Sequence, residues 1–70
     1  MNLEFKKEIP NCVGQYLIHW KSGEFEVISV YFLPKRFRYG VEWDEGLFYG
    51  IRHISSLNLD MAHGIAKLPD

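Results

Sequence analysis

Disulfide bonds are excluded within this chain of 70 residues, because Cys12 is its only cysteine. A lone thiol also favours a reducing, cytoplasmic setting. The sequence lacks any apolar run close to the ~20 residues that a membrane-spanning helix needs. Its first residues, 1–8, show no pattern of a cleaved leader, so we expect no signal peptide. We therefore expect a cytoplasmic protein without membrane segments.

A net charge is nearly missing as well, since eight Lys and Arg side chains stand against nine Asp and Glu side chains. Small proteins that bind nucleic acids through phosphate contacts are commonly strongly basic. The near-neutral balance makes nucleic acid a less expected partner than another protein, although it does not exclude nucleic acid.

Patterns that carry catalysis or hold metals are absent too. The softest metal ligands are Cys12, His19, His53 and His63, and their spacing matches no zinc motif. The sequence has no nucleophile elbow, phosphate-binding loop or paired-carboxylate signature. A chain this short also leaves little room to enclose a substrate pocket of ~300 Å³ or more. We expect no metal, no cofactor and no enzymatic activity.

The strongest structural signal is a β-hairpin formed by residues 15–20 and 24–32, which Lys21, Ser22 and Gly23 connect. Both stretches are rich in the β-branched and aromatic residues that favour strands, and a Ser-Gly pair favours a tight turn. The second stretch is apolar on both faces, which is typical of a central strand in a sheet that curls or is covered. The remaining apolar segments are too short to form a core alone and should pack on this hairpin.

Weaker patterns extend the structure on both sides of the hairpin. Alternation predicts an extended edge segment over 3–9, a short strand over 39–43 and a last strand over 47–54. In the tail, apolar residues at spacings of three and four predict one short helix over 57–63, followed by an extended segment over 65–68. Residues 57–68 also remain compatible with a wholly extended conformation.

These elements predict one mainly β (α+β) domain over residues 1–70. We expect a small antiparallel, strongly curved sheet or barrel of four to five strands, with one short C-terminal helix and the 15–32 hairpin at its centre. The expected core consists of Leu17, Ile18, Val27, Ile28, Val30, Phe32, Val41, Leu47, Ile51, Ile54, Leu57 and Met61.

The candidate binding segment lies in the middle of the chain, where aromatic residues alternate with charges. Aromatic residues make up 16% of the sequence, more than so small a core is expected to hold, and exposed aromatic residues are enriched in protein interfaces. A basic run is followed closely by an acidic one, and the two runs could also pair across a hairpin. We predict that a protein partner binds Arg36, Phe37, Arg38, Tyr39, Trp43, Asp44 and Glu45.

Two alternatives use the same composition differently. A small β-barrel that binds nucleic acid would place arginines on phosphates and aromatic rings on bases. Its contact residues would be Lys35, Arg36, Phe37, Arg38 and Tyr39. The second alternative is a homodimer or larger self-assembly, in which an aromatic face is covered by its own copy.

Short motifs at both ends also resemble small domains of unknown function that phages and prophages encode. Those domains run from Leu-Pro into a Gly-led strand and close on His-Trp-x-x-Leu-Pro. The matching pieces here are Ile9-Pro10, residues 14–18, and His63 with Leu68-Pro69, although Gly64 stands where the Trp would be. The resemblance implies a phage accessory protein that inhibits a host or bacterial defence protein, such as a CRISPR effector.

Overall fold

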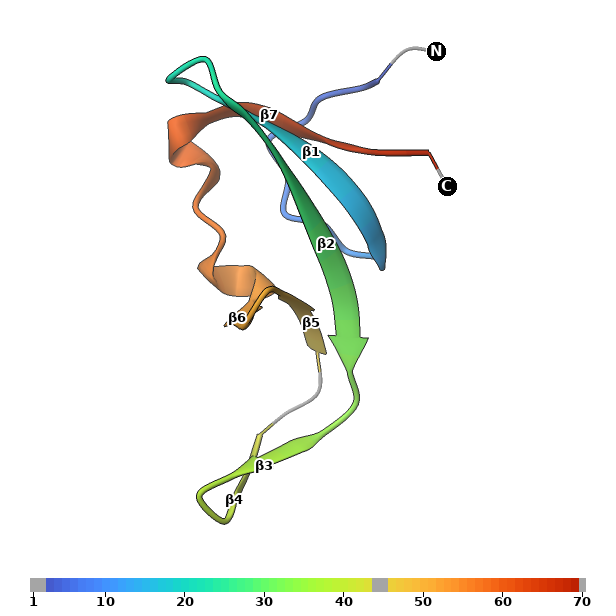
Figure 1. The fold of residues 1–70 in the computed structure, drawn as a ribbon, viewed down its shortest axis with the longest axis vertical. Helices are drawn as coiled ribbons and strands as arrows, with labels where there is room; N and C mark the ends of the chain where they lie inside the picture. The colour runs from blue at the N-terminus through green and yellow to red at the C-terminus, as the bar shows by residue number, and fades with distance from the viewer. Residues whose placement is uncertain (1–2, 44–45, 70) are drawn as a thin grey trace.

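The computed structural model describes residues 3–43 and 46–69; for residues 36, 38 and 43 it describes the backbone alone. The described part contains seven strands and two short 3₁₀ turns. Five strands form one antiparallel sheet in the order β6-β5-β2-β1-β7, and β3 pairs separately with β4 (Figure 1). The elements are β1 (Gly14–Trp20), β2 (Phe25–Leu33), β3 (Arg36–Arg38), β4 (Val41–Trp43), β5 (Gly46–Tyr49), β6 (Arg52–His53), η1 (Ile54–Ser56), η2 (Leu59–Met61) and β7 (Ala62–Lys67).

The central hairpin predicted from the sequence is confirmed, because β1 and β2 pair antiparallel from Gly14 opposite Val30 to His19 opposite Phe25. Its turn is closed by two backbone hydrogen bonds between Trp20 and the turn residues, at 2.8 and 2.9 Å. Gly23 adopts a φ of 96° there, a conformation that glycine takes without steric conflict. β2 is the middle strand of the sheet, as expected for a strand with two apolar faces.

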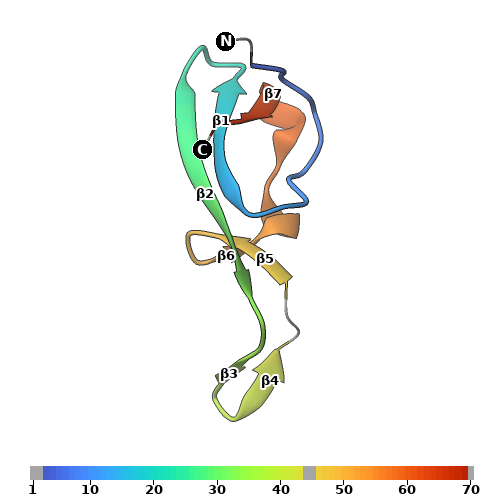
Figure 2. The ribbon, with the colours of Figure 1, turned by 90° about the vertical axis from the view of Figure 1, so that its right-hand side faces the viewer.

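One face of this sheet is covered by the chain itself. β6 and β7 lie at opposite edges, so the link between them, residues 54–61, must cross the sheet. It buries Ile54, Leu57 and Leu59 in the core cluster that also contains Ile18 and Val30. In Figure 2 this link and the N-terminal segment lie on the same side of β1 and β2. The fold is therefore a single main sheet with its core cluster on one face.

The expected core is only partly right for this reason. Ile18, Ile28, Val30, Ile54 and Leu57 are buried as predicted, and Leu17 and Leu47 are half-buried. The prediction is wrong for five residues, all of which are exposed. Val27 lies on the opposite face, Phe32 lies near the end of β2, and Val41 lies in the separate hairpin. The other two, Ile51 and Met61, lie in turns. The core instead includes six residues that the sequence pattern did not single out, namely Tyr16, Phe48, Leu59, Ala62, Ile65 and Ala66.

The expected C-terminal helix over 57–63 is wrong, and the described residues contain no α-helix. Two 3₁₀ turns occupy the region instead, each capped by a side chain. His53 Nδ1 accepts a hydrogen bond from the backbone N–H of Ser55, and Asn58 Oδ1 accepts one from Asp60. β7 then pairs with β1, which satisfies backbone groups that a short, marginal helix would have held alone.

Three further expectations need correction. The sheet does not close into a barrel, since β6 and β7 remain its edges. The strand expected over 47–54 is two strands, because Gly50 turns the chain with a φ of 57° between β5 and β6. Residues 3–9 form no strand, although Lys6 makes two backbone hydrogen bonds with Ile65 of β7, at 2.9 and 2.8 Å. No helix among the described residues has the length and apolar character to cross a membrane.

Candidate protein-binding hairpin

The β3–β4 hairpin stands apart from the main sheet. Leu33 and Gly46 are the last paired residues of β2 and β5, and the chain between them leaves the sheet. Figures 1 and 2 both show β3 and β4 projecting at the end of the molecule opposite the β1–β2 turn. The Cα radius of gyration is 13.4 Å, against roughly 11 Å for a compact chain of this length. The hairpin therefore extends the molecule beyond the main sheet.

A strained turn connects the two strands of this hairpin. Arg36 pairs with Trp43 and Arg38 with Val41, so Tyr39 and Gly40 form a two-residue loop. Both loop residues have positive φ, 55° and 75°, as in the type I′ turns that match the twist of β-strands. Such turns prefer Asn-Gly, and a tyrosine in the left-handed region costs about 1–2 kcal/mol.

The apolar side chains of the hairpin that the structure describes are exposed to solvent. Phe37 is 71% exposed, Tyr39 is 91% exposed and Val41 is 56% exposed. Lys35 Nζ lies 3.4 Å from Glu42 Oε1, but both side chains are largely exposed, so the pair adds about 0–1 kcal/mol at most. The hairpin therefore presents aromatic surface beside a pair of opposite charges.

The structure gathers most of the predicted contact segment on this one hairpin. Phe37 and Tyr39 are exposed on it, and Lys35 of the nucleic-acid alternative lies at its base. The backbone of Arg36, Arg38 and Trp43 belongs to β3 and β4, whereas the side chains of these three residues, and all of Asp44 and Glu45, lie outside the described part of the chain. The alternative in which the basic and acidic runs pair across a hairpin is seen for one pair, Lys35 and Glu42.

Neighbouring aromatic residues belong to the main sheet. Phe48 is 2% exposed, and its ring lies 5.0 Å from the ring of His53 and 6.4 Å from that of Tyr31. Tyr49 is half-buried against the core cluster. These rings serve packing, which separates them from the exposed rings of the hairpin.

The cysteine and the histidines form no metal site within the described residues, where no three His, Cys, Asp or Glu side chains lie close enough to hold an ion. The Tyr16 hydroxyl donates a hydrogen bond of 2.8 Å to the carbonyl oxygen of Cys12 and lies 3.0 Å from its Sγ. Burial of the ring, with the contact to Cys12, raises the pKa of Tyr16 to about 12. This group therefore holds the N-terminal segment onto β1.

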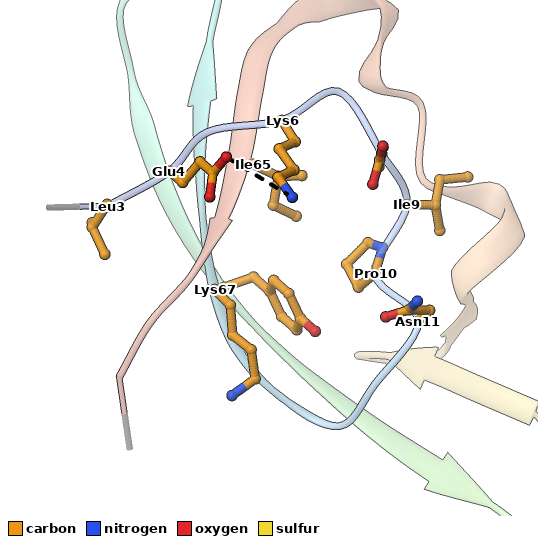
Figure 3. Close-up of a pocket in the computed structure, with 10 residues that line it drawn as sticks. Leu3, Glu4, Lys6, Ile9, Pro10, Asn11, Ile65 and Lys67 are labelled. Atoms are coloured by element: carbon orange, nitrogen blue, oxygen red, sulfur yellow. Dashed lines mark ion pairs between the residues drawn. The ribbon is translucent and has the colours of Figure 1, made fainter.

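A cleft of about 400 Å³ lies between that segment and the sheet, at the end of the molecule away from the hairpin (Figure 3). The cleft is open to solvent and not enclosed, so the expectation that the chain leaves little room to enclose a substrate pocket stays a prediction. The buried side chains of Tyr16 and Ile65 line it, and its rim carries charges of both signs from Glu4, Lys6, Glu8 and Lys67. Because the two signs balance, the cleft favours no strongly charged ligand, and the hairpin remains the better candidate.

Comparisons with known proteins found no match to this chain. No protein-family model matches the chain, and neither a curated protein nor a solved structure matches it. The functional argument therefore depends on the surfaces of the chain itself.

Proposed function

We propose that this chain is a non-enzymatic protein-binding module whose β3–β4 hairpin inserts its aromatic side chains into a groove of a partner protein. The observation that carries the proposal is the exposure of Phe37 and Tyr39 on a hairpin outside the main sheet. Large aromatic side chains are the commonest anchors of protein interfaces, because each buries a large area with few rotatable bonds.

The electrostatics of the hairpin support a protein partner. Lys35 is already paired with Glu42, so part of the basic charge is neutralised within the hairpin. Charges of both signs around an aromatic centre suit a mixed protein surface, where they steer the approach and fix the register. A phosphate backbone, by contrast, would be repelled by Glu42.

The resemblance to phage-encoded domains extends this proposal to a class of partner. We propose a phage-type inhibitor that binds a host or bacterial defence protein, such as a CRISPR effector, and blocks it by occupying a functional surface. A projecting, aromatic-tipped hairpin suits this role, because it can enter a cleft that a flat surface does not reach.

The test is capture from nuclease-treated bacterial lysate with three tagged proteins: the wild type, the Phe37→Ala/Tyr39→Ala variant and an Ile51→Ser control. Ile51 is as exposed as Tyr39, 91%, but lies in a different turn. We expect a discrete protein that the wild type and the control retain and the double variant loses. When binding is measured with the purified partner, the double variant should bind at least about thirtyfold more weakly than the wild type, because it has lost two anchoring rings. Equal capture by all three proteins would contradict the proposal.

The exposed rings beside Lys35 are also compatible with the nucleic-acid alternative. The salt dependence of binding distinguishes that alternative from a protein partner. Affinity for nucleic acid should fall steeply with salt, because each neutralised phosphate releases condensed counterions. We expect binding to the captured protein to fall only weakly, since aromatic anchors dominate it. Recovery of nucleic acid alone from untreated lysate, lost after nuclease treatment, would favour the alternative.

A further inference from the structure

The middle strand of the sheet has a neighbour on only one side along half of its length. β2 pairs with β1 over residues 25–30, but β5 pairs with β2 only from Val30 to Leu33. In Figure 2 the first half of β2 forms the left-hand border of the ribbon, above β5 and β6. The sheet therefore has an additional edge in its middle, beside residues 25–29.

The backbone groups on this edge follow from the alternation of hydrogen bonds along a strand. The N–H of Trp20 donates a hydrogen bond of 2.8 Å to the carbonyl oxygen of Glu24, so every second residue from Glu24 onward directs its N–H and C=O to β1. The residues between them direct theirs to the other side, where Tyr31 faces Phe48 of β5. We call the remaining groups on that side, those of Phe25, Val27 and Ser29, the open edge. Among the described residues, no backbone group is hydrogen-bonded to the open edge.

The two outer edges of the sheet are protected, whereas the open edge is not. Lys6 of the N-terminal segment exchanges two backbone hydrogen bonds with Ile65 of β7, and β6 contains only 2 residues. Proteins commonly protect sheet edges by such covering or shortening, or with proline, lysine or a bulge. Residues 25–29 contain neither proline nor lysine, and they pair with β1 without a bulge. Phe25 is 58% exposed and Val27 is 56% exposed, so solvent reaches this part of β2.

A row of outward N–H and C=O groups is complementary to another extended backbone, which can add one strand to the sheet. We propose that the open edge binds an extended segment of another protein, which lies beside β2 in line with β5. The added strand is antiparallel to β2, because all pairs in this sheet are antiparallel and this arrangement is slightly the more stable. The space between the β1–β2 turn and the β5–β6 turn accommodates about five residues of such a segment.

The side chains beside the open edge define the chemistry of the segment. Ile28 is 7% exposed and belongs to the core cluster, so the residue that faces it extends the core and should be apolar. Val27 on the other face favours a β-branched residue opposite it. Glu26 Oε1 accepts a hydrogen bond of 3.0 Å from Trp20 Nε1, which holds the carboxylate beside the strand and favours lysine or arginine opposite it. The segment therefore reads apolar, β-branched, basic in consecutive positions.

A second copy of this chain does not fit the open edge equally well. Two β2 strands paired antiparallel about Val27 would place residues 30–33 of one copy opposite residues 21–24 of the other. β5 already occupies that side of residues 30–33, so the β1–β2 turn of each copy would overlap β5 of the other. A single segment that carries no neighbouring strand avoids this overlap.

The test uses the whole chain and a synthetic peptide, acetyl-Thr-Val-Ile-Arg-Tyr-Lys-amide, with amide exchange measured by NMR. In the chain alone, the amides of Phe25 and Val27 should exchange at least about tenfold faster than those of Glu26 and Ile28, because only the latter two are bonded to β1. A peptide concentration of about three times Kd should slow exchange at Phe25 and Val27 about fourfold. Exchange at Glu26 and Ile28 should change less.

Two methylated peptides provide the matched control. N-methylation of the peptide isoleucine, whose N–H faces Val27, should weaken binding by about tenfold or more, because it removes a backbone hydrogen bond. N-methylation of the peptide arginine, whose N–H points away from β2, should leave affinity within about twofold.

On the protein side, Val27→Pro removes only an outward N–H and should fold, since proline is tolerated where a strand nitrogen faces no neighbour. It should lose the peptide, whereas Val27→Thr should retain it. If Val27→Pro unfolds, the methylated peptides still give the answer.

Four outcomes would overturn the inference. They are slow exchange of Phe25 and Val27 in the chain alone, no binding up to about 5 mM peptide, equal binding of both methylated peptides, and a mass of twice 8.2 kDa that Val27→Pro abolishes. The last would show that a second copy occupies the edge. None of them affects the proposed function, because its test substitutes the hairpin rings and leaves β2 unchanged.

Discussion

Tyr39 has a backbone conformation that its side chain disfavours, yet the ring is almost fully exposed at the tip of the hairpin. Strain of this kind is typically found at functional sites, where the side chain is needed for something other than folding. Tyr39→Asn should relieve the strain, because asparagine is favoured with glycine in such turns. Amide exchange of β3 and β4 should then slow by about fivefold, corresponding to about 1 kcal/mol.

The same substitution should weaken capture of the protein partner, because the anchoring ring is gone. This opposite effect on hairpin order and on binding is what separates a binding role from a structural one. Faster amide exchange in the hairpin of the Tyr39→Asn variant than in that of the wild type would contradict the strain argument. Gly40→Ala, which adds strain at the adjacent position, is the comparison variant.

Tyr16 predicts a pH dependence of stability. Its pKa is raised to about 12 in the folded chain, from an ordinary value near 10, chiefly by burial. The folded state therefore holds the phenol proton more tightly than the unfolded state does. The resulting stabilisation is complete below pH ~10 and is lost as the pH rises through about 12.

Urea unfolding at several pH values checks this prediction, with Tyr16→Phe as the reference. At neutral pH the variant should lose about 0.5–1.5 kcal/mol with the hydrogen bond to Cys12. Between pH 10 and 12 its free energy of unfolding should decline less steeply than that of the wild type. Parallel profiles would show that Tyr16 is not the titrating group.

At the scale of elements, sequence patterns correctly predicted the strands that pair with a neighbour in sequence. Alternation and turn chemistry predicted β1, β2 and the turn between them, because all three depend on residues near each other in sequence. The prediction of a helix in the tail failed because the helical spacing of Leu57, Met61 and Ile65 is also compatible with two capped turns and a strand. Pairing of β7 with β1 decided between them, and that contact joins residues more than forty positions apart.

The same limit explains the errors in the predicted core. β2 is apolar on both faces, so its pattern does not indicate which face is covered. The cover is the link over 54–61, whose path follows from β6 and β7 lying at opposite edges. Val27 was therefore placed in the core although it is exposed on the face of β2 opposite the core cluster. The binding segment was identified by composition, but only the separation of β3 and β4 from the main sheet distinguished exposed Phe37 from buried Phe48.

On the scale of the whole molecule, the proposed binding hairpin is separate from the part that holds the core. The five-stranded sheet holds the core cluster, and none of the described side chains of β3 and β4 belongs to it. The hairpin is inserted between Leu33 and Gly46, which are register partners in neighbouring antiparallel strands. Such partners can be joined directly by a two-residue turn. The fold therefore predicts that the hairpin is removable without loss of the sheet.

Replacing residues 34–45 with Asn-Gly tests this prediction. The shortened chain should unfold with a free energy within about 1 kcal/mol of the wild type, since none of the described side chains that are removed belongs to the core cluster and an isolated two-stranded hairpin is itself marginal. The Cα radius of gyration should fall from 13.4 Å towards roughly 11 Å, which small-angle scattering can measure as the corresponding decrease. Capture of the protein partner should disappear. A shortened chain that fails to fold would show that the hairpin stabilises the sheet, and one that still captures the partner would show that the binding site lies outside the hairpin.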